Sequence, residues 1–383
     1  MPYENERANP LGLESLKQNL SAIGRINRWT MDQEVEEGEG ELLDTRTMDS
    51  LQGGPTFRLE DLGEVTTVDG SVVVASEKLP VAALKIAVVR QDLQKYGELL
   101  ERPHGRPVST KDYNACYSTT TYSAILPSEA FSQPPEHLAY KVELLELLKS
   151  WRTPQGKLLA SFLRSDLGLS NDEIKEDVIA PLTYFSEDHT GAMVLLEKLL
   201  AAATAFESRG LHISDGPFYL HQHPKLSRRI LEKYRKFSHD TAIVGVVKTG
   251  SLVTLFSRGG EREGALAPGE ILMVTSGFQG RTLKQSRLPM AKHFVYQSPT
   301  SGLIVFTMLP SQGQVEEDKW GNYPHLPTVL SYIDLDRSDR FKNSLEIIAR
   351  ANFETSLPKV ETQRWLRSLL LKSRHQVDFN SAE

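Results

Sequence analysis

The chain has 383 residues, of which 39% are hydrophobic and 25% are charged, so it can bury a large core in one or two domains. Its formal net charge of −6 and its isoelectric point near 6.0 give no general attraction to a nucleic-acid backbone. The sequence also contains no basic cluster with interleaved aromatic residues, which would create a local attraction. Composition therefore predicts that nucleic acid is not a partner.

Two further features bound the class of protein. Residues 1–18 are polar and charged, and no stretch approaches about eighteen uninterrupted apolar residues, so we expect a cytoplasmic protein with no membrane contact. The one cysteine, Cys116, excludes an internal disulfide bond and a cysteine-based zinc site. Its neighbours are polar and aromatic rather than basic, which favours a buried structural thiol over an activated nucleophile.

The first half of the chain divides at a change in composition. Residues 1–57 are acidic and rich in glycine and asparagine, and we expect them to be flexible or laid over the surface of the rest. Residues 58–210 are expected to be mainly helical, with one β-hairpin at Asp69-Gly70, a dipeptide that suits a tight turn between two β-branched runs. Apolar spacing predicts helices at 81–102, 136–151, 156–167 and 191–209, and a Ser/Thr/Tyr/Pro-rich loop is expected at 106–135.

The stretch from Gly216 to Pro310 contains runs with period-two apolar alternation, which begin at Ala242, Ser251, Glu270, Ala291 and Gly302. Such short connections leave no room for crossover helices, so we expect antiparallel strands that curl into a closed sheet. The predicted fold class is α+β: a double-stranded β-helix (jelly-roll) barrel core at 211–330 with flanking helices at both ends. The C-terminal region 331–383 is expected to form helices at 339–351 and 360–374, which either brace the sheet or make a homodimer contact.

Histidines near a carboxylate are the residues that could carry chemistry. His221 and His223 would share one face of a strand, and such a pair on a barrel strand can hold a metal. His239-Asp240 precedes one predicted strand and His293 lies inside another, so these residues could share a metal ion or a proton inside the barrel. The alternative is structural: Asp240 caps a turn and the histidines make ordinary polar contacts.

The order of these motifs resembles the core of the iron- and 2-oxoglutarate-dependent oxygenases related to isopenicillin N synthase. The resemblance implies a jelly-roll barrel that binds iron(II) and 2-oxoglutarate. It lies within 218–310 and is carried by His223-Pro224, Asp240, Pro268-Gly269, Ser276-Gly277, the turn at 280–286, and His293.

Two departures fall where that family's chemistry is concentrated. If Asp240 stands for the family's metal-binding Asp, Ser238 replaces the first metal-binding histidine, and His239 points away from the metal unless a bulge shifts the register. The family's Arg-x-Ser, which anchors 2-oxoglutarate, has no counterpart in 298–306, because that segment contains no basic residue. What survives of the resemblance is the pocket of the barrel.

We therefore expect a cofactor-independent cyclase or pericyclase of secondary metabolism, of Diels–Alder or hetero-Diels–Alder type, whose pocket holds a small organic substrate in a reactive geometry. No metal and no cofactor are expected. Two alternatives stay open: an iron(II)- and 2-oxoglutarate-dependent oxygenase with a rearranged metal site at His239, Asp240 and His293, and a non-catalytic small-molecule-binding protein. The expected catalytic residues are His239, Asp240, His293, Arg281 and Gln285, and the expected substrate-binding residues are Tyr219, His221, His223, Phe278, Lys292 and Phe294.

Overall fold

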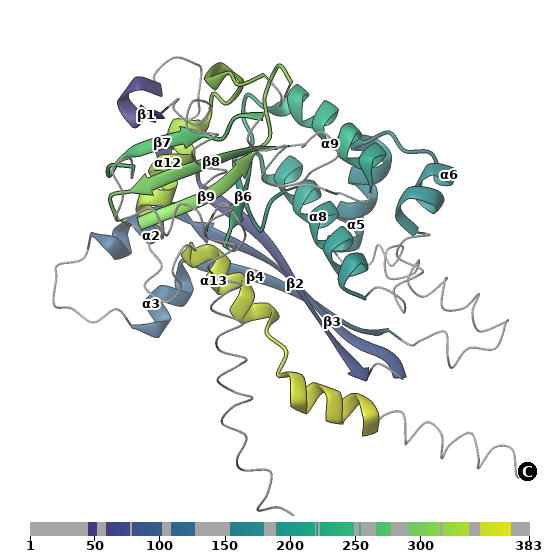
Figure 1. The fold of residues 1–383 in the computed structure, drawn as a ribbon. Coiled ribbons are helices and arrows are strands. Elements are labelled where there is room, and N and C mark those ends of the chain that lie inside the picture. Colours follow the sequence, from purple (N-terminus) through teal and green to yellow (C-terminus); the bar gives the residue numbers. More distant parts are fainter. Residues whose placement is uncertain are drawn as a thin grey trace, which may run out of the picture.

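The structure is a computed structural model, and it describes fourteen ranges of the chain. They are residues 45–51, 59–76, 79–101, 109–126, 154–179, 189–218, 220, 223–248, 253, 266–276, 291–300, 302–314, 317–336 and 345–368. Together they form one mixed sheet with helices on both of its faces (Figure 1).

Within the described residues the sheet has nine strands in the order β1-β7-β8-β9-β6-β5-β2-β3-β4, with β1 and β4 at its two edges. Strand β5 pairs parallel with both β2 and β6, whereas the other neighbours pair antiparallel. The strands are β1 (Thr45–Thr47), β2 (Glu64–Ser76), β3 (Leu79–Asp92), β4 (Tyr117–Leu126), β5 (Leu211–Asp215), β6 (Ala242–Val247), β7 (Glu270–Met273), β8 (Lys292–Ser298) and β9 (Gly302–Met308).

This open sheet shows that the predicted closed jelly-roll barrel is wrong, and so is the resemblance to the iron- and 2-oxoglutarate-dependent oxygenases. The difference from the predicted barrel arises at the connection between β5 and β6. That connection contains α9 (Pro224–Phe237), a crossover helix that lets the two strands run parallel. Pro224 occupies the first turn of α9, where the missing N–H group of a proline leaves no hydrogen bond unmade. The α+β class itself is confirmed.

A second correction concerns 64–126. Asp69-Gly70 forms no hairpin turn but lies inside β2, where Asp69 pairs with Ala87 and Gly70 with Ile86 of β3. The predicted helix at 81–102 is the strand β3 followed by the short helix α2 (Leu93–Leu100). Strand β3 is buried on both faces, so its apolar run is nearly continuous and also fits helical spacing. The predicted loop at 106–135 contains α3 (Thr110–Ala115) and β4.

Other predicted elements are confirmed. The runs that begin at Ala242, Glu270, Ala291 and Gly302 are β6 to β9. Of the run that begins at Ser251, only residue 253 is described, and the predicted helix at 136–151 lies outside the described residues. The predicted helices at 156–167 and 191–209 correspond to α5 (Pro154–Ser161) with the π-helical segment η5 (Phe162–Asp166) and to α8 (His189–Ser208). The predicted helices at 339–351 and 360–374 lie partly outside the described residues; α13 (Glu346–Thr355) overlaps the end of the first, and an unlabelled helix at 359–368 covers the start of the second.

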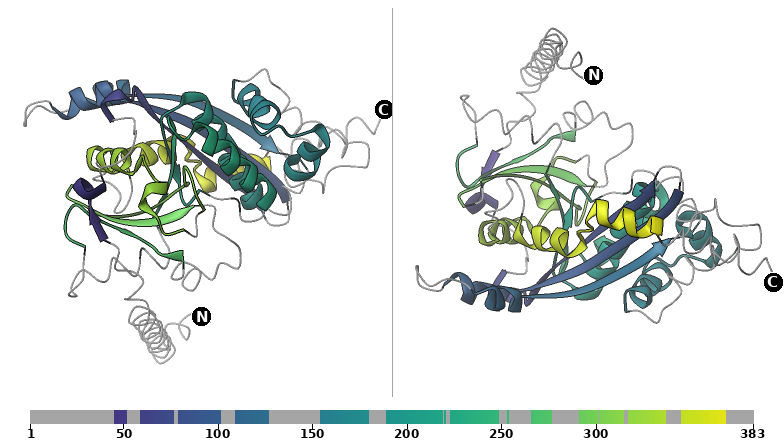
Figure 2. Two further views of the ribbon diagram at one scale, coloured as in Figure 1. Left: turned by 90° about the horizontal axis from the view of Figure 1, so that it is seen from above. Right: turned by 90° about the horizontal axis from the view of Figure 1, so that it is seen from below.

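Helices α5, α8 and α9 cover one face of the sheet, and α12 (Leu326–Leu335) and α13 cover the other, as Figure 2 shows. Helix α8 packs closely because its centre is a run of small residues, of which Ala201, Ala202 and Ala203 are buried. Helix α9 buries one stripe, Leu226, Ile230 and Tyr234, at a spacing of four residues. The short segments that complete the described chain are η2 (Met48–Leu51), η3 (Leu59–Asp61), α6 (Asn171–Ile174), η6 (Lys175–Ile179) and η9 (Trp320–Asn322).

None of the helices in the described ranges combines the length and the apolar character that are needed to cross a membrane.

Candidate functional site

The site that stands out lies where β5 leaves the sheet. Strands β2 and β5 run parallel up to the pair Val68 and Ser214, after which β5 ends at Asp215 and β2 continues to Ser76. Gly216, with a positive φ of 71°, turns the chain out of the sheet. The carboxyl ends of parallel strands are a common place for ligand sites in open sheets, because the connections that follow them diverge there.

Asp69 and Asp215 lie side by side at this point. The register places Asp69 next to Asp215, and both side chains point to the face that α13 covers. The hydroxyl group of Thr355, in α13, donates to Asp69 Oδ2. The amide of Asn352, one turn earlier in α13, lies 3.4 Å from Asp215 Oδ2.

Two lysines meet the same group of carboxylates. The ammonium group of Lys248, directly after β6, lies 2.6 Å from Asp215 Oδ2. Lys198, in α8, reaches the end of β5 from the opposite face, where its Nζ lies 2.6 Å from Ser214 Oγ, 2.5 Å from the backbone oxygen of Asp215 and 3.1 Å from Glu197 Oε1. We call Asp69, Glu197, Lys198, Asp215 and Lys248 the β5 cluster.

Gly70 is the residue that lets α8 come so close to β2. A Cβ atom at this position would lie 1.9 Å from the terminal methyl group of Met193 and 3.6 Å from Glu197 Oε2. The side chain of Asp69 therefore lies on one face of β2, and the absence of a side chain at Gly70 leaves room for Glu197 on the other face.

The β5 cluster contains more carboxylates than ammonium groups. Burial, opposed by the nearby Lys198 and assisted by Asp69 and Asp215, raises the pKa of Glu197 to about 7. Burial also raises the pKa of Asp69, partly offset by the hydrogen bond from Thr355, and Asp215 adds to the rise. Three carboxylates and two ammonium groups leave one net negative charge in a poorly solvated place.

In the structure, the carboxylates of the β5 cluster are contacted by lysine ammonium groups and by one hydroxyl group. No group of three or more His, Cys, Asp and Glu side chains among the described residues is arranged to hold a metal ion. Lys248 and Asp215 remain reachable from solvent, since 28% and 24% of their side-chain surfaces are exposed.

The residues predicted from the sequence do not meet at this site. His239 is 72% exposed at the end of α9, and its ring lies 3.6 Å from Asp240, which pairs with Arg209 at 2.8 Å. His293 lies level with Gly245 across the sheet, because both pair with Thr307. Asp240 precedes Gly245 by five residues, or about 17 Å of strand. His239 and Asp240 are therefore not brought together with His293.

Three residues of the predicted set, Lys292, His293 and Phe294, lie on β8 and are buried. The ring of Phe294 stacks on Phe306 with 5.4 Å between ring centroids. Lys292 is fully buried and pairs with Asp318 while donating to Ser276 Oγ at 2.8 Å. His293 is buried, and its Nδ1 has no hydrogen-bond partner among the described residues. Burial, followed by the nearby Lys292, lowers its pKa to about 4.

His223, the remaining described residue of the predicted set, precedes α9, and burial lowers its pKa. The predicted substrate-binding residues Tyr219, His221 and Phe278 and the predicted catalytic residues Arg281 and Gln285 lie outside the described residues.

Two signals in the sequence could have pointed to the β5 cluster. Asp69-Gly70 and Asp215-Gly216 each follow a run of mostly apolar or β-branched residues. Asp215 is the last residue of β5, whereas Asp69 lies inside β2. Glu197-Lys198 is a charged pair inside the apolar helix VLLEKLLAAATAF, where it must find partners once buried. No local signal brings Lys248 or Asn352 to the same place, because only the fold does so.

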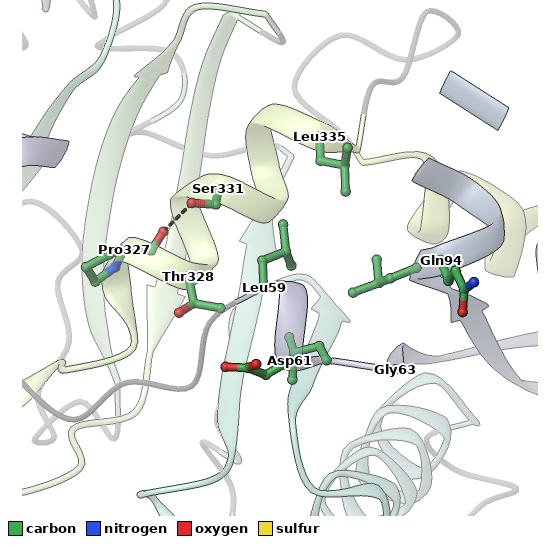
Figure 3. Close-up of a pocket in the computed structure, with 10 residues that line it drawn as sticks. Leu59, Asp61, Gly63, Gln94, Pro327, Thr328, Ser331 and Leu335 are labelled. Carbon is green, nitrogen blue, oxygen red and sulfur yellow. Dashed lines mark hydrogen bonds between the residues drawn. The ribbon is translucent and has the colours of Figure 1, made fainter. Parts of the chain in front are cut away.

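A second feature is a groove of about 850 Å³ between η3, α2 and α12 (Figure 3). Its walls are mostly apolar, and Asp61, Gln94, Thr328 and Ser331 add polar groups. The hydroxyl group of Ser331 is used within α12, where it donates to the backbone oxygen of Pro327 at 3.0 Å. The apolar lining consists of Leu59, Leu62, Gly63, Leu93, Pro327 and Leu335.

Comparisons with known proteins assign no family to this chain. No protein-family model matches it, and no curated protein does. Among solved structures, the chain is similar to endonuclease V of Ciona intestinalis in complex with a 24mer DNA that contains an inosine followed by a ribo-adenosine. The two chains are 13% identical, the match covers 91% of this chain and 98% of that chain, and the TM-score is 0.28. An Asp-to-Asn variant of that enzyme, in complex with a 23mer DNA, gives 13% identity, coverage of 90% and 98%, and a TM-score of 0.27. Likeness at this level carries no argument about fold or function.

Proposed function

We propose that the β5 cluster is a divalent-cation site that hydrolyses a phosphodiester bond. The observation that carries this proposal is that Asp69 and Asp215 lie side by side on the face of the sheet that α13 covers, with Lys248 on Asp215. Glu197 and Lys198 approach the same end of β5 from the opposite face. Carboxylate oxygens are the ligands that Mg²⁺ and Mn²⁺ prefer, and such ions are held by a few carboxylates together with phosphate oxygens of the substrate.

The raised pKa values of Glu197 and Asp69 support cation binding. Carboxylates that repel one another in a buried place are stabilised by a cation, which lowers their pKa values. Binding requires Lys248 to release Asp215 Oδ2, and its ammonium group then becomes available to an anionic substrate. One divalent cation would change the net charge of the cluster from one negative to one positive, which matches the single negative charge of a phosphodiester.

The chemistry would divide between the cation and the chain. A bound divalent cation polarises the phosphoryl group and the attacking water. Lys248 would hold a phosphate oxygen, and an ionised carboxylate of the β5 cluster would accept a proton from the water. The new P–O bond forms as the ester P–O bond breaks, and the leaving oxygen takes up a proton, so water is the only co-reactant.

The first test is Mn²⁺ titration of the purified protein by calorimetry and electron paramagnetic resonance. We expect Asp215→Asn to lose most of the binding, whereas Asp166→Asn, which removes a carboxylate paired with Lys233, should bind as the unchanged protein does. Because Glu197 must lose its proton, affinity should rise as the pH rises through about 7. Absence of Mn²⁺ binding by the unchanged protein would overturn the proposal.

The second test is hydrolysis with Mn²⁺ or Mg²⁺ present. The substrates are bis(p-nitrophenyl) phosphate, its monoester and a single-stranded oligonucleotide. Cleavage of the two diesters with loss in Asp215→Asn would support the proposal, and cleavage of the monoester alone would contradict its charge argument. The composition-based prediction that nucleic acid is not a partner is tested by the same assay.

The groove favours a second candidate function, which is small-molecule binding. Its mostly apolar walls with a few polar groups are typical of such sites. Nile red, a neutral apolar dye, should fluoresce on binding to the groove, and Leu335→Asp should abolish the signal while Leu100→Asp, at an exposed leucine, leaves it unchanged. The cyclase expected from the sequence stays a prediction, and the barrel pocket that it assumed is replaced by a groove between helices.

A further inference from the structure

Strand β4 is the longer of the two edges of the sheet within the described residues. It has ten residues and pairs with β3 in an unbroken antiparallel register, from Tyr117 with Gln91 to Leu126 with Ala82. No described strand pairs with the other side of β4. Every second residue of such a strand directs its N–H and C=O groups away from the sheet, so β4 presents a row of backbone hydrogen-bonding groups.

The composition of β4 does not shield this edge. Free edges in natural proteins are commonly shielded by charged side chains, by proline, by a bulge or by being very short. The strand YSTTTYSAIL contains no charged residue and no proline, and its pairing with β3 has no bulge. The other edge, β1, is different, because it has only three residues and the middle one is Arg46. Strand β4 therefore has the features of a strand that pairs with a further strand.

The middle of β4 is open to solvent. Ser118, Thr120 and Thr121 are exposed, and Thr119 is half-buried. An approaching strand can therefore reach this part of the edge. The run of three threonines also suits a second copy of the same strand, because threonine pairs across neighbouring antiparallel strands are favourable.

We infer that two copies of this chain associate by antiparallel pairing of β4 with β4 about a two-fold axis at Thr120. Residues equally far from 120 then lie opposite each other, so Thr119 meets Thr121 of the second copy and Ser118 meets Tyr122. Since β4 is uncharged, no like charges meet along the seam. The two sheets become one continuous sheet. This inference does not depend on the proposed cation site.

An exposed aromatic residue beside β4 supports this association. Phe353, in α13, is 69% exposed, more than any other large apolar side chain in the described ranges. Helix α13 contacts β4, and the guanidinium carbon of Arg350 lies 5.9 Å from the ring centre of Tyr117 and 5.8 Å from that of Phe353. Phe353 therefore lies near the start of β4. Pairing about Thr120 brings a second strand alongside this end of β4 and removes apolar surface of Phe353 from water.

The first test is sedimentation equilibrium of the full chain over a series of protein concentrations. We expect a dimer, with twice the 42.9 kDa mass of one chain. Thr120→Lys places two like charges opposite each other at the axis and should raise the dissociation constant about tenfold or more. Thr47→Lys is the matched control, because it adds the same charge at an exposed position of the other edge strand, and it should associate as the unchanged protein does. Circular dichroism checks that both variants fold.

The second test locates the axis by cross-linking of single cysteines under mild oxidation. Thr120→Cys should form a disulfide bond between two copies, because opposite Cα atoms lie about 4.5–5.5 Å apart, within reach of such a bond. Ser118→Cys should not, because its two copies would lie about 14 Å apart along the seam. The unchanged protein should not cross-link either, since Cys116 is buried.

A monomer at every concentration would overturn the inference, and a strand of a different protein would then be the partner to test. A dimer that Thr120→Lys leaves intact would also overturn it, because the copies would then meet at another surface, such as the C-terminal helices. Cross-linking through residue 118 and not through residue 120 would overturn it as well, since the pairing would not be centred on Thr120.

Discussion

Gly245 lies in the middle of β6, where the chain that leaves β5 crosses over it. A Cβ atom here would lie 2.6 Å from the backbone oxygen of Gly216, 2.6 Å from the backbone nitrogen of Phe218 and 2.7 Å from Thr307 Oγ1. Two of these atoms belong to the backbone that directly follows Asp215, so they cannot move aside as the end of a flexible side chain would. The position of Asp215 therefore depends on the absence of a side chain at 245.

We predict that Gly245→Ala lowers the free energy of unfolding by about 1–3 kcal/mol and weakens Mn²⁺ binding. Urea denaturation and the Mn²⁺ titration measure the two effects. Gly97→Ala is the matched control, because a Cβ atom there meets nothing within 4 Å inside α2. The control should gain about 0.5–1 kcal/mol, and equal behaviour of the two variants would contradict the prediction.

Asp336 gives a second prediction at this scale, because its pKa is about 6 in the folded chain, above the ordinary aspartate value of 3.8. Between these values the folded chain binds more protons than the unfolded chain, so stability falls as the pH rises through this window and levels off above it. Asp336→Asn has no such proton. Relative to that variant, the unchanged protein should lose up to about 1.4 kcal/mol per pH unit between pH 4 and pH 6, measured by denaturation at each pH. A constant difference across this range would refute the assigned pKa shift.

At the scale of elements, short apolar runs between turn residues were predictable as strands. Strands β6 to β9 have four to seven residues each, too few for a typical helix, and they were predicted although β6 is buried at every position. Strand β3 has 14 residues and is buried on both faces, so its nearly continuous apolar run also fits a helix. Helix α9 went unrecognised since His221 and His223 were assigned to a strand, although Pro224 is a helix-start signal. Asp69 and Asp215 carry a local signal, but their meeting depends on the parallel pairing of β2 and β5, which no short segment encodes.

Helix α9 allows a direct test of that missed element. We predict that Ile230→Ala, which removes a fully buried side chain, lowers the free energy of unfolding by about 2–5 kcal/mol. Arg228→Ala, on the exposed side of the same helix, should change it by less than about 0.5 kcal/mol. If 224–237 were a strand with alternating exposure, positions 228 and 230 would share one face, and the two substitutions would behave alike.

At the scale of the whole molecule, the sheet is continuous from β1 to β4, and one apolar cluster reaches from Phe294 on β8 to Val89 on β3. A core that spans both halves of a sheet favours one cooperative transition, although cooperativity weakens in larger chains. The β8 half carries Trp320, whose ring lies 6.0 Å from that of Phe294.

We therefore predict that Leu199→Ala, in α8 on the other half, shifts the unfolding midpoint seen by the fluorescence of Trp320 as much as the midpoint seen by circular dichroism. The fluorescence is read in a background in which the other three tryptophans, Trp29, Trp151 and Trp365, are replaced by phenylalanine. Val194→Ala, at an exposed position of α8, is the control. A fluorescence midpoint that stays in place while circular dichroism shifts would mean that the two halves unfold separately.

The hydrogen bond from Thr355 to Asp69 joins residues that are 286 positions apart. During synthesis, Asp69, Glu197 and Asp215 all leave the ribosome long before α13 exists, so the strands can pair while the acidic end of β5 still lacks its last two partners. A chain released before residue 355 would therefore carry the sheet without the finished site. The order of translation thus makes the β5 cluster one of the last parts of the molecule to mature.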